Sequence, residues 1–227
     1  MAVEDHTDEC RTHEGQQMKY RAVFLDFDGT LMDTSEGVMN GARYAMAKAG
    51  LAIGPDADWG GFIGPPLHEC FEIAFGIKDR QMQDTLCAYY REYYQKEGMF
   101  QAFFYDGIIE VIKKLREAGV LMGIASMKNT DLIYKMCDHF GVSDLFDGMF
   151  GLNLSEDNTK ADVLREGFAR FSLAPEQCVL VGDTPVDENG ATEAGCVCLK
   201  AGWGFGFKPD MPDTLKTPYD ILKAVGL

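Results

Sequence analysis

Short apolar segments recur along the chain, and each ends abruptly in polar or small residues. These segments end at Asp26, Ser126, Phe150, Gly182 and Lys200. Stretches with helical spacing lie between and after them, at residues 108–117, 130–140, 160–171, 187–194 and 219–225. Near-continuous apolar runs are typical of strands that are buried on both faces, and each connection is long enough for a crossover helix. The pattern therefore predicts an α/β fold with a doubly wound parallel sheet.

The pattern is helical, with little strand signal, from Thr34 to about Phe104. Apolar residues follow one helical stripe at Val38, Ala42, Ala45, Met46 and Ala49, and a second stripe runs from Met82 to Tyr94. We expect an inserted all-helical domain over residues 34–104, with hinges near 32–35 and 103–107. The sheet domain would then comprise residues 18–33 and 105–227.

The first predicted strand runs into the string VFLDFDGTLMD, at residues 23–33. It places two carboxylates, Asp26 and Asp28, at the strand end and in a glycine turn. Burying unpaired like charges is unfavourable, so the string indicates a bound cation or a reaction that uses the repulsion. An ordinary Asp-Gly turn is the alternative interpretation.

This string resembles the first motif of the haloacid-dehalogenase-like hydrolase superfamily. The resemblance implies that Asp26 is a nucleophile and that Asp28 is a general acid and base. Members that cleave carbon–halogen or carbon–phosphorus bonds lack an aspartate at the second position, so Asp28 favours a phosphate ester as the substrate. The turn residues Gly29 and Thr30 would contribute to phosphate binding.

Three later segments resemble the remaining motifs of that superfamily. Ser126 ends the second strand and could donate to a phosphate oxygen, although Met127 departs from the small polar residue usual there. Lys160 follows a capping residue and would hold the phosphoryl group and the nucleophile, with Lys128 as the competing candidate. Asp183 and Asp187, in the string GDTPVD, match the fourth motif; Asp187 could also cap the helix that follows.

The oxygen atoms of these motifs indicate a hard cation. Asp26, Asp183 and the backbone carbonyl of Asp28 form an all-oxygen set of the kind that Mg²⁺ prefers, with Asp187 as a supporting residue. The sequence therefore predicts a Mg²⁺-dependent phosphomonoester hydrolase that forms an aspartyl-phosphate at Asp26. A phosphosugar mutase of the β-phosphoglucomutase type and a non-catalytic regulatory protein are the alternatives.

The helical insertion resembles the C1 cap of the phosphoglycolate-phosphatase-like branch, and most closely the bacterial 5'-nucleotidase-like subgroup. The string GFIGPPL at residues 61–67 carries this resemblance, and it implies a specificity loop at Gly64, Pro65 and Pro66. Residues 101–102 and 153–158 depart from the subgroup. The resemblance implies a small substrate of the phosphoglycolate or nucleoside 5'-monophosphate type. Cap aromatics such as Tyr90 could stack on a base, but simple packing is the commoner role.

Composition narrows the choice of partners. The chain has 227 residues and a net charge of −15, which argues against a nucleic-acid polymer as partner. Its seven cysteines form no C-x-x-C pair, and no segment is apolar enough for a membrane span or a signal peptide. We therefore expect a cytoplasmic monomer or homodimer that does not bind membranes. Residues 1–17 are polar and acidic and are predicted to be a disordered tail.

Overall fold

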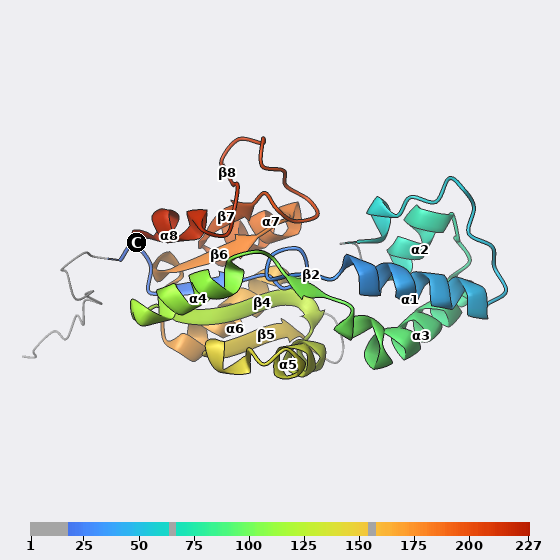
Figure 1. Ribbon diagram of the computed structural model, residues 1–227, viewed down its shortest axis with the longest axis horizontal. Coiled ribbons are helices and arrows are strands. Elements are labelled where there is room, and N and C mark those ends of the chain that lie inside the picture. Colours follow the sequence, from blue (N-terminus) through green and yellow to red (C-terminus); the bar gives the residue numbers. More distant parts are fainter. Residues whose placement is uncertain (1–17, 64–66, 154–157) are drawn as a thin grey trace, which may run out of the picture.

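The computed structural model describes residues 18–63, 67–153 and 158–227 and contains a six-stranded parallel sheet (Figure 1). The strand order is β5-β4-β1-β6-β7-β8. The strands are β1 (Ala22–Leu25), β4 (Leu121–Asn129), β5 (Gly148–Leu152), β6 (Cys178–Gly182), β7 (Val197–Ala201) and β8 (Thr214–Leu215). This architecture confirms the predicted fold class. The two-residue edge strand β8 was not predicted, because its pattern is too short to stand out.

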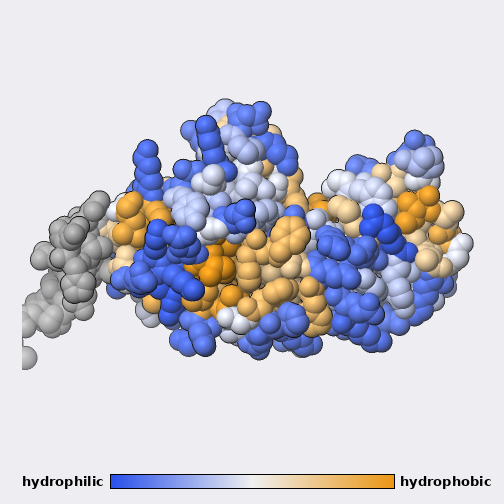
Figure 2. Space-filling model, in the orientation of Figure 1, coloured by the Kyte–Doolittle hydropathy of each residue, from blue (hydrophilic) through white to orange (hydrophobic). Residues whose placement is uncertain are grey.

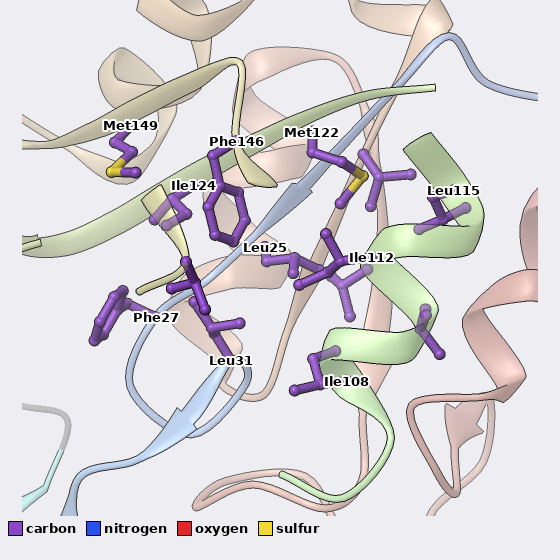
Figure 3. Close-up of a cluster of buried hydrophobic side chains, with 14 of the residues drawn as sticks. Leu25, Phe27, Leu31, Ile108, Ile112, Leu115, Met122, Ile124, Phe146 and Met149 are labelled. Atoms are coloured by element: carbon purple, nitrogen blue, oxygen red, sulfur yellow. The ribbon is translucent and has the colours of Figure 1, made fainter. Parts of the chain in front are cut away.

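Two layers of helices cover the sheet, one on each face, so that β1 is buried on both sides. Val23 and Leu25 point to one face, towards α4 (Ile108–Glu117), α5 (Thr130–His139) and α8 (Asp220–Val225). Figure 3 shows Ile108 and Ile112 of α4 pointing towards Leu25 and the sheet. The opposite face packs against α6 (Lys160–Phe171) and α7 (Pro185–Ala194). Such complete burial fixes the position of the residues that follow β1.

Three helices form a second lobe beside the sheet: α1 (Ser35–Lys48), α2 (Leu67–Phe75) and α3 (Arg80–Lys96) (Figure 1). They enclose their own apolar cluster, which includes Phe62, Phe71 and Leu86. Hydrophilic residues cover much of the visible surface of both lobes (Figure 2). The inserted helical cap is thus confirmed as part of the fold, whereas its boundaries at 34 and 104 stay a prediction.

The chain enters and leaves the cap through a two-stranded antiparallel ribbon. It consists of β2 (Met32–Asp33) and β3 (Phe103–Phe104), which pair in register at Met32 with Phe104. Both strands lie within the segments expected to be hinges. The remaining short elements are the 3₁₀ helices η1 (Gly60–Phe62), η2 (Gly98–Phe100), η3 (Ser143–Leu145) and η4 (Pro175–Gln177).

Side-chain caps set the starts of the two helices that carry candidate site residues. At α6, the Thr159 hydroxyl accepts from the Asp162 N–H, and the Asp162 carboxylate accepts from the Thr159 N–H. At α7, the Asp187 carboxylate accepts from the Thr184 N–H. The sequence indicates capping at both helix starts, by the residue before Lys160 and by Asp187. They place Lys160 and Asp187 in the first turns of their helices.

Some segments for which the sequence makes predictions lie outside the part of the chain that the structure describes. The tail at 1–17, the cap-loop residues Gly64, Pro65 and Pro66, and positions 154–157 lie outside the described residues. Among the residues that are described, no helix is both long enough and apolar enough to cross a membrane.

Candidate active site

The polar residues predicted for the site gather near the carboxyl ends of three neighbouring parallel strands, although β4 continues to Asn129 beyond the strand end predicted at Ser126. Asp26 follows β1, Ser126 lies in β4 beside it, and Asp183 follows β6 on the other side. Ligands of open α/β sheets bind at this edge, outside the carboxyl ends of the strands. The sheet order therefore brings together residues that are more than 150 positions apart in the chain.

Lys160 joins two carboxylates at the centre of this group. Its Nζ atom lies 2.6 Å from Asp26 Oδ1 and 2.6 Å from Asp187 Oδ1. Burial alone would lower the pKa of Lys160, but the carboxylates of Asp187 and Asp26 raise it well above its usual range. A cation in the first turn of α6 opposes the helix dipole, so these two carboxylates explain its position. Lys160, rather than Lys128, is the lysine that contacts Asp26.

The charge of Asp26 is only partly compensated. Burial raises the pKa of Asp26 to about 7, against the lowering effect of Lys160. The carboxylates of Asp187 and Asp183 raise it further. Within the described part of the chain, Asp26 Oδ2 has no hydrogen-bond partner, whereas Oδ1 is held by Lys160. Asp26 thus keeps one oxygen available at the edge of the sheet.

Asp183 is fully buried and held by polar groups from two other segments. Its Oδ1 accepts from the Thr30 hydroxyl at 3.0 Å, and its Oδ2 accepts from the Phe205 N–H at 2.7 Å. Burial nevertheless raises the pKa of Asp183 to about 6. The side chain is therefore fixed in direction while its charge stays incompletely balanced.

Asp187 has a supporting position. Its Oδ1 binds Lys160, and its Oδ2 accepts from both the N–H and the hydroxyl of Thr184 at the start of α7. Both oxygens are thus occupied by groups of the protein. This arrangement agrees with a residue that orients Lys160 and caps a helix.

Asp28 faces a different cation. Lys128 Nζ lies 2.9 and 3.0 Å from its two oxygens, and the Thr34 hydroxyl donates to Oδ1 at 2.6 Å. Lys128 also donates to the hydroxyl of Tyr94, on α3 of the cap. Burial would lower the pKa of Lys128, but the Asp28 carboxylate and the Tyr94 hydroxyl together raise it above its usual range. The competing lysine of the sequence is therefore a partner of Asp28 that also contacts the cap.

The turn after β1 depends on glycine. Gly29 has φ of 86°, and a Cβ atom there would lie 2.3 Å from Asp183 Oδ2. The Thr30 hydroxyl donates to the Asp183 carboxylate, and the Gly29 N–H donates to the Met32 carbonyl. Ser126 is buried, and its Oγ accepts from the Lys128 N–H at 3.3 Å. Phosphate binding by Gly29, Thr30 and Ser126 stays a prediction.

The buried carboxylates fit a hard divalent cation. One oxygen each from Asp26, Asp183 and Asp187 lie within 4.8 Å of one another, and all three residues are buried. Lys160 contacts the carboxylates of Asp26 and Asp187, and Asp183 has no ion pair among the described residues, so the three carboxylates are incompletely neutralised. Carboxylate oxygens in this number suit Mg²⁺ or a similar ion. Asp26 and Asp183 are the better ligands, because Asp26 keeps one oxygen without a partner among the described residues and Asp183 accepts only from neutral donors, whereas Asp187 is bound to Lys160 and Thr184.

The family model for haloacid dehalogenase-like hydrolases matches residues 23–201, which is most of the chain and includes every residue of this group. The chain belongs to the haloacid dehalogenase-like hydrolase family. This membership confirms the resemblance carried by the strings at the strand ends. It also identifies the protein as a phosphatase-like enzyme with a candidate metal site.

Known proteins similar to this haloacid dehalogenase-like hydrolase have several activities. It is 29% identical over 203 residues to a 5'-nucleotidase of Pseudomonas aeruginosa, covering 89% of this chain and 91% of that protein. It is 32% identical over 197 residues to the tyrosine-protein kinase PtkA of Mycobacterium tuberculosis, covering 86% of this chain and 66% of that protein. Phosphoglycolate phosphatases of Xanthomonas campestris are more distant, at 26%.

A solved structure agrees with the fold. The structure of a haloacid dehalogenase-like family hydrolase from Streptococcus pneumoniae has a TM-score of 0.81 and 32% identity. The match covers 91% of this chain and 98% of that one. The similarity therefore extends over both the sheet and the helical cap.

Some contacts of the site could not be anticipated from the sequence of this hydrolase. Tyr94 contacts Lys128, Thr34 contacts Asp28 and the Phe205 N–H contacts Asp183, yet none of the three belongs to a motif. Each contact depends on how distant segments pack. A tyrosine in a helical stripe carries no signal that separates such a contact from ordinary packing.

Replacing Thr30 by Val should destabilise the hydrolase. The substitution removes the hydroxyl donor of a fully buried carboxylate oxygen, which typically costs about 1–3 kcal/mol. Urea denaturation with a chelator present measures the effect. The exposed Thr192, whose hydroxyl donates to the Glu188 carbonyl, provides the control Thr192→Val. Equal midpoints for both variants would show that the Thr30 contact contributes nothing.

Proposed function

We propose that this hydrolase is a Mg²⁺-dependent phosphomonoesterase that transfers the phosphoryl group to Asp26 and then to water. One observation carries the proposal. A buried carboxylate at the end of the central strand has one oxygen bound to a lysine and the other without a hydrogen-bond partner among the described residues, beside a second buried carboxylate. A nucleophile needs a fixed position and an available lone pair, and Asp26 has both.

Each residue of the site would have a separate role in the reaction. Asp26 Oδ2 would attack phosphorus, while Lys160 would bind an oxygen of the phosphoryl group and hold Asp26 in place. Ser126 would donate to another phosphoryl oxygen. Asp28 would give a proton to the leaving oxygen and later take one from the attacking water. Departure of the leaving group thus breaks one P–O bond as the bond to Asp26 forms.

The metal site would be formed by Asp26, Asp183 and the backbone carbonyl of Asp28, with Asp187 as support. When bound, Mg²⁺ supplies positive charge that offsets repulsion between a carboxylate nucleophile and an anionic substrate. The protein supplies the fixed directions of the two carboxylates. The incomplete neutralisation of the three carboxylates supports the assignment.

The substrate we propose is a small phosphorylated metabolite, either a nucleoside 5'-monophosphate or phosphoglycolate. Relatives with both activities support this choice. The cap helices beside the strand ends would help to exclude bulk water from the reaction. We further propose a cytoplasmic location, which the buried thiols of Cys70, Cys87 and Cys137 support.

A phosphate-release screen tests this function. It would compare nucleoside 5'-monophosphates, phosphoglycolate, sugar phosphates and pyrophosphate, each with Mg²⁺ and with excess chelator. We expect release from a monoester that depends on Mg²⁺ and returns when Mg²⁺ is added back. Release at the same rate in chelator would refute the metal requirement, and absence of release from every compound would refute the phosphomonoesterase.

A further inference from the structure

The segment Gly202–Phe207, here called the glycine loop, follows β7 and lies outside the four sequence motifs. It nevertheless lies against the candidate metal site. The structure places it beside Asp183, to which it is joined by backbone hydrogen bonds. The loop therefore contacts a carboxylate of the proposed metal site directly.

Backbone amides of the glycine loop donate to both the side chain and the backbone carbonyl of Asp183. The N–H groups of Phe205 and Gly206 donate to Asp183 Oδ2, at 2.7 and 3.4 Å. The Phe207 N–H donates to the Asp183 carbonyl at 2.7 Å. Amide donors favour the charged carboxylate and fix its direction. The direction in which Asp183 presents its remaining lone pairs therefore depends on the loop.

A second contact ties the loop to the turn after β1. The indole N–H of Trp203 donates to the Thr30 carbonyl at 3.1 Å, and the Thr30 hydroxyl donates to Asp183 Oδ1 at 3.0 Å. The loop, the turn and Asp183 thus form a closed circuit of hydrogen bonds. The segments that carry the two proposed metal-binding carboxylates, Asp26 and Asp183, are joined through this circuit.

Close packing at Gly204 leaves no space for a side chain. A Cβ atom at this position would lie 2.2 Å from the Gly29 carbonyl oxygen and 2.4 Å from Asp183 Cβ. Neither of these atoms can move without disturbing the turn or the carboxylate. A side chain at 204 must therefore displace the loop from Asp183.

We propose that the glycine loop is part of the metal site, as the element that positions Asp183, so that Mg²⁺ binding and docking of the loop stabilise each other. The proposal rests on the metal assignment of the proposed function. Loss of a group that orients a metal ligand typically weakens metal binding by about 10–100-fold. Because the coupling is reciprocal, bound Mg²⁺ must also hold the loop in place.

Calorimetric titration of MgCl₂ into Gly204→Ala tests the proposal directly. We expect the dissociation constant to rise by about tenfold or more relative to the wild type. The control is Gly54→Ala, since a Cβ atom at Gly54 meets nothing within 4 Å. Unchanged affinity in Gly204→Ala would overturn the proposal. If that variant is unfolded in chelator, the substitution Trp203→Phe, which removes the indole donor and reduces the ring, tests the same point. We then expect the dissociation constant for Mg²⁺ to rise severalfold, and an unchanged constant would overturn the proposal.

Fluorescence gives a readout that a general loss of stability would not produce. The chain has two tryptophans, Trp59 in the cap and Trp203 in the loop, so Trp59→Phe leaves the loop indole as the sole tryptophan. Its emission should change on Mg²⁺ addition, with the dissociation constant found by calorimetry. An unchanged emission while calorimetry records binding would overturn the loop's role alone. Absence of Mg²⁺ binding by the wild type would instead refute the metal assignment, and the proposal with it.

Discussion

Asp26→Asn should abolish phosphate release, with kcat lowered by at least about 10³-fold. The amide is nearly the same size as the carboxylate, so the fold and the contact with Lys160 Nζ can persist. It cannot act as the nucleophile, however, because it lacks the negative charge that attacks phosphorus. The loss should appear in kcat for every substrate that the wild type accepts.

The control for this variant is Asp144→Asn, at an exposed aspartate of η3. It removes the same charge from the molecule without touching the site and should keep wild-type rates. Thermal unfolding of both variants in chelator checks that activity is not lost through unfolding. Retention of more than about a tenth of the wild-type kcat in Asp26→Asn would exclude Asp26 as the nucleophile.

Lys160→Met should destabilise the protein strongly as well as inactivate it. The ammonium group lies 2.6 Å from carboxylates of both Asp26 and Asp187, and all three residues are buried. Removing one partner of a buried ion pair typically costs about 3–5 kcal/mol, because the remaining charge is left uncompensated. Urea denaturation in chelator measures this loss in the free energy of unfolding.

A second substitution separates charge from packing in that experiment. Adding Asp187→Asn to Lys160→Met removes one of the stranded carboxylates and should restore part of the lost stability, which makes the two changes strongly non-additive. The exposed Lys223→Met serves as the control and should stay near wild type. Additive effects of the two site substitutions would show that Lys160 does not neutralise Asp187.

The strand ends and the residues at them could be predicted from the sequence because both depend on local pattern. An apolar run that stops at Asp26 or Gly182 identifies a buried strand and its edge, and parallel strands must present those ends together. The capping boxes of α6 and α7 are likewise local, since they involve residues three apart. Fold class and the gathering of Asp26, Ser126 and Asp183 follow from these patterns.

The partners of those residues could not be predicted in the same way. Lys128 contacts Asp28 across 100 positions, and Trp203 contacts Thr30 across 173. Such contacts depend on the exact crossing of helices, the register of strands and the path of a glycine-rich loop. The sequence contains two plausible lysines and favours Lys160, because that residue follows a capping residue at a helix start. The packing of α6 against the sheet then places Lys160 against Asp26.

Trapping the phosphorylated enzyme tests the central claim, that Asp26 carries the phosphoryl group, most directly. Enzyme mixed with Mg²⁺ and its best substrate would be quenched in acid during turnover, reduced with borohydride and mapped by peptide mass spectrometry. Reduction converts an aspartyl-phosphate to homoserine, so we predict homoserine at position 26 and at no other aspartate, and none when substrate is omitted. Homoserine at another position, or none at 26 while phosphate is released at full rate, would contradict the account.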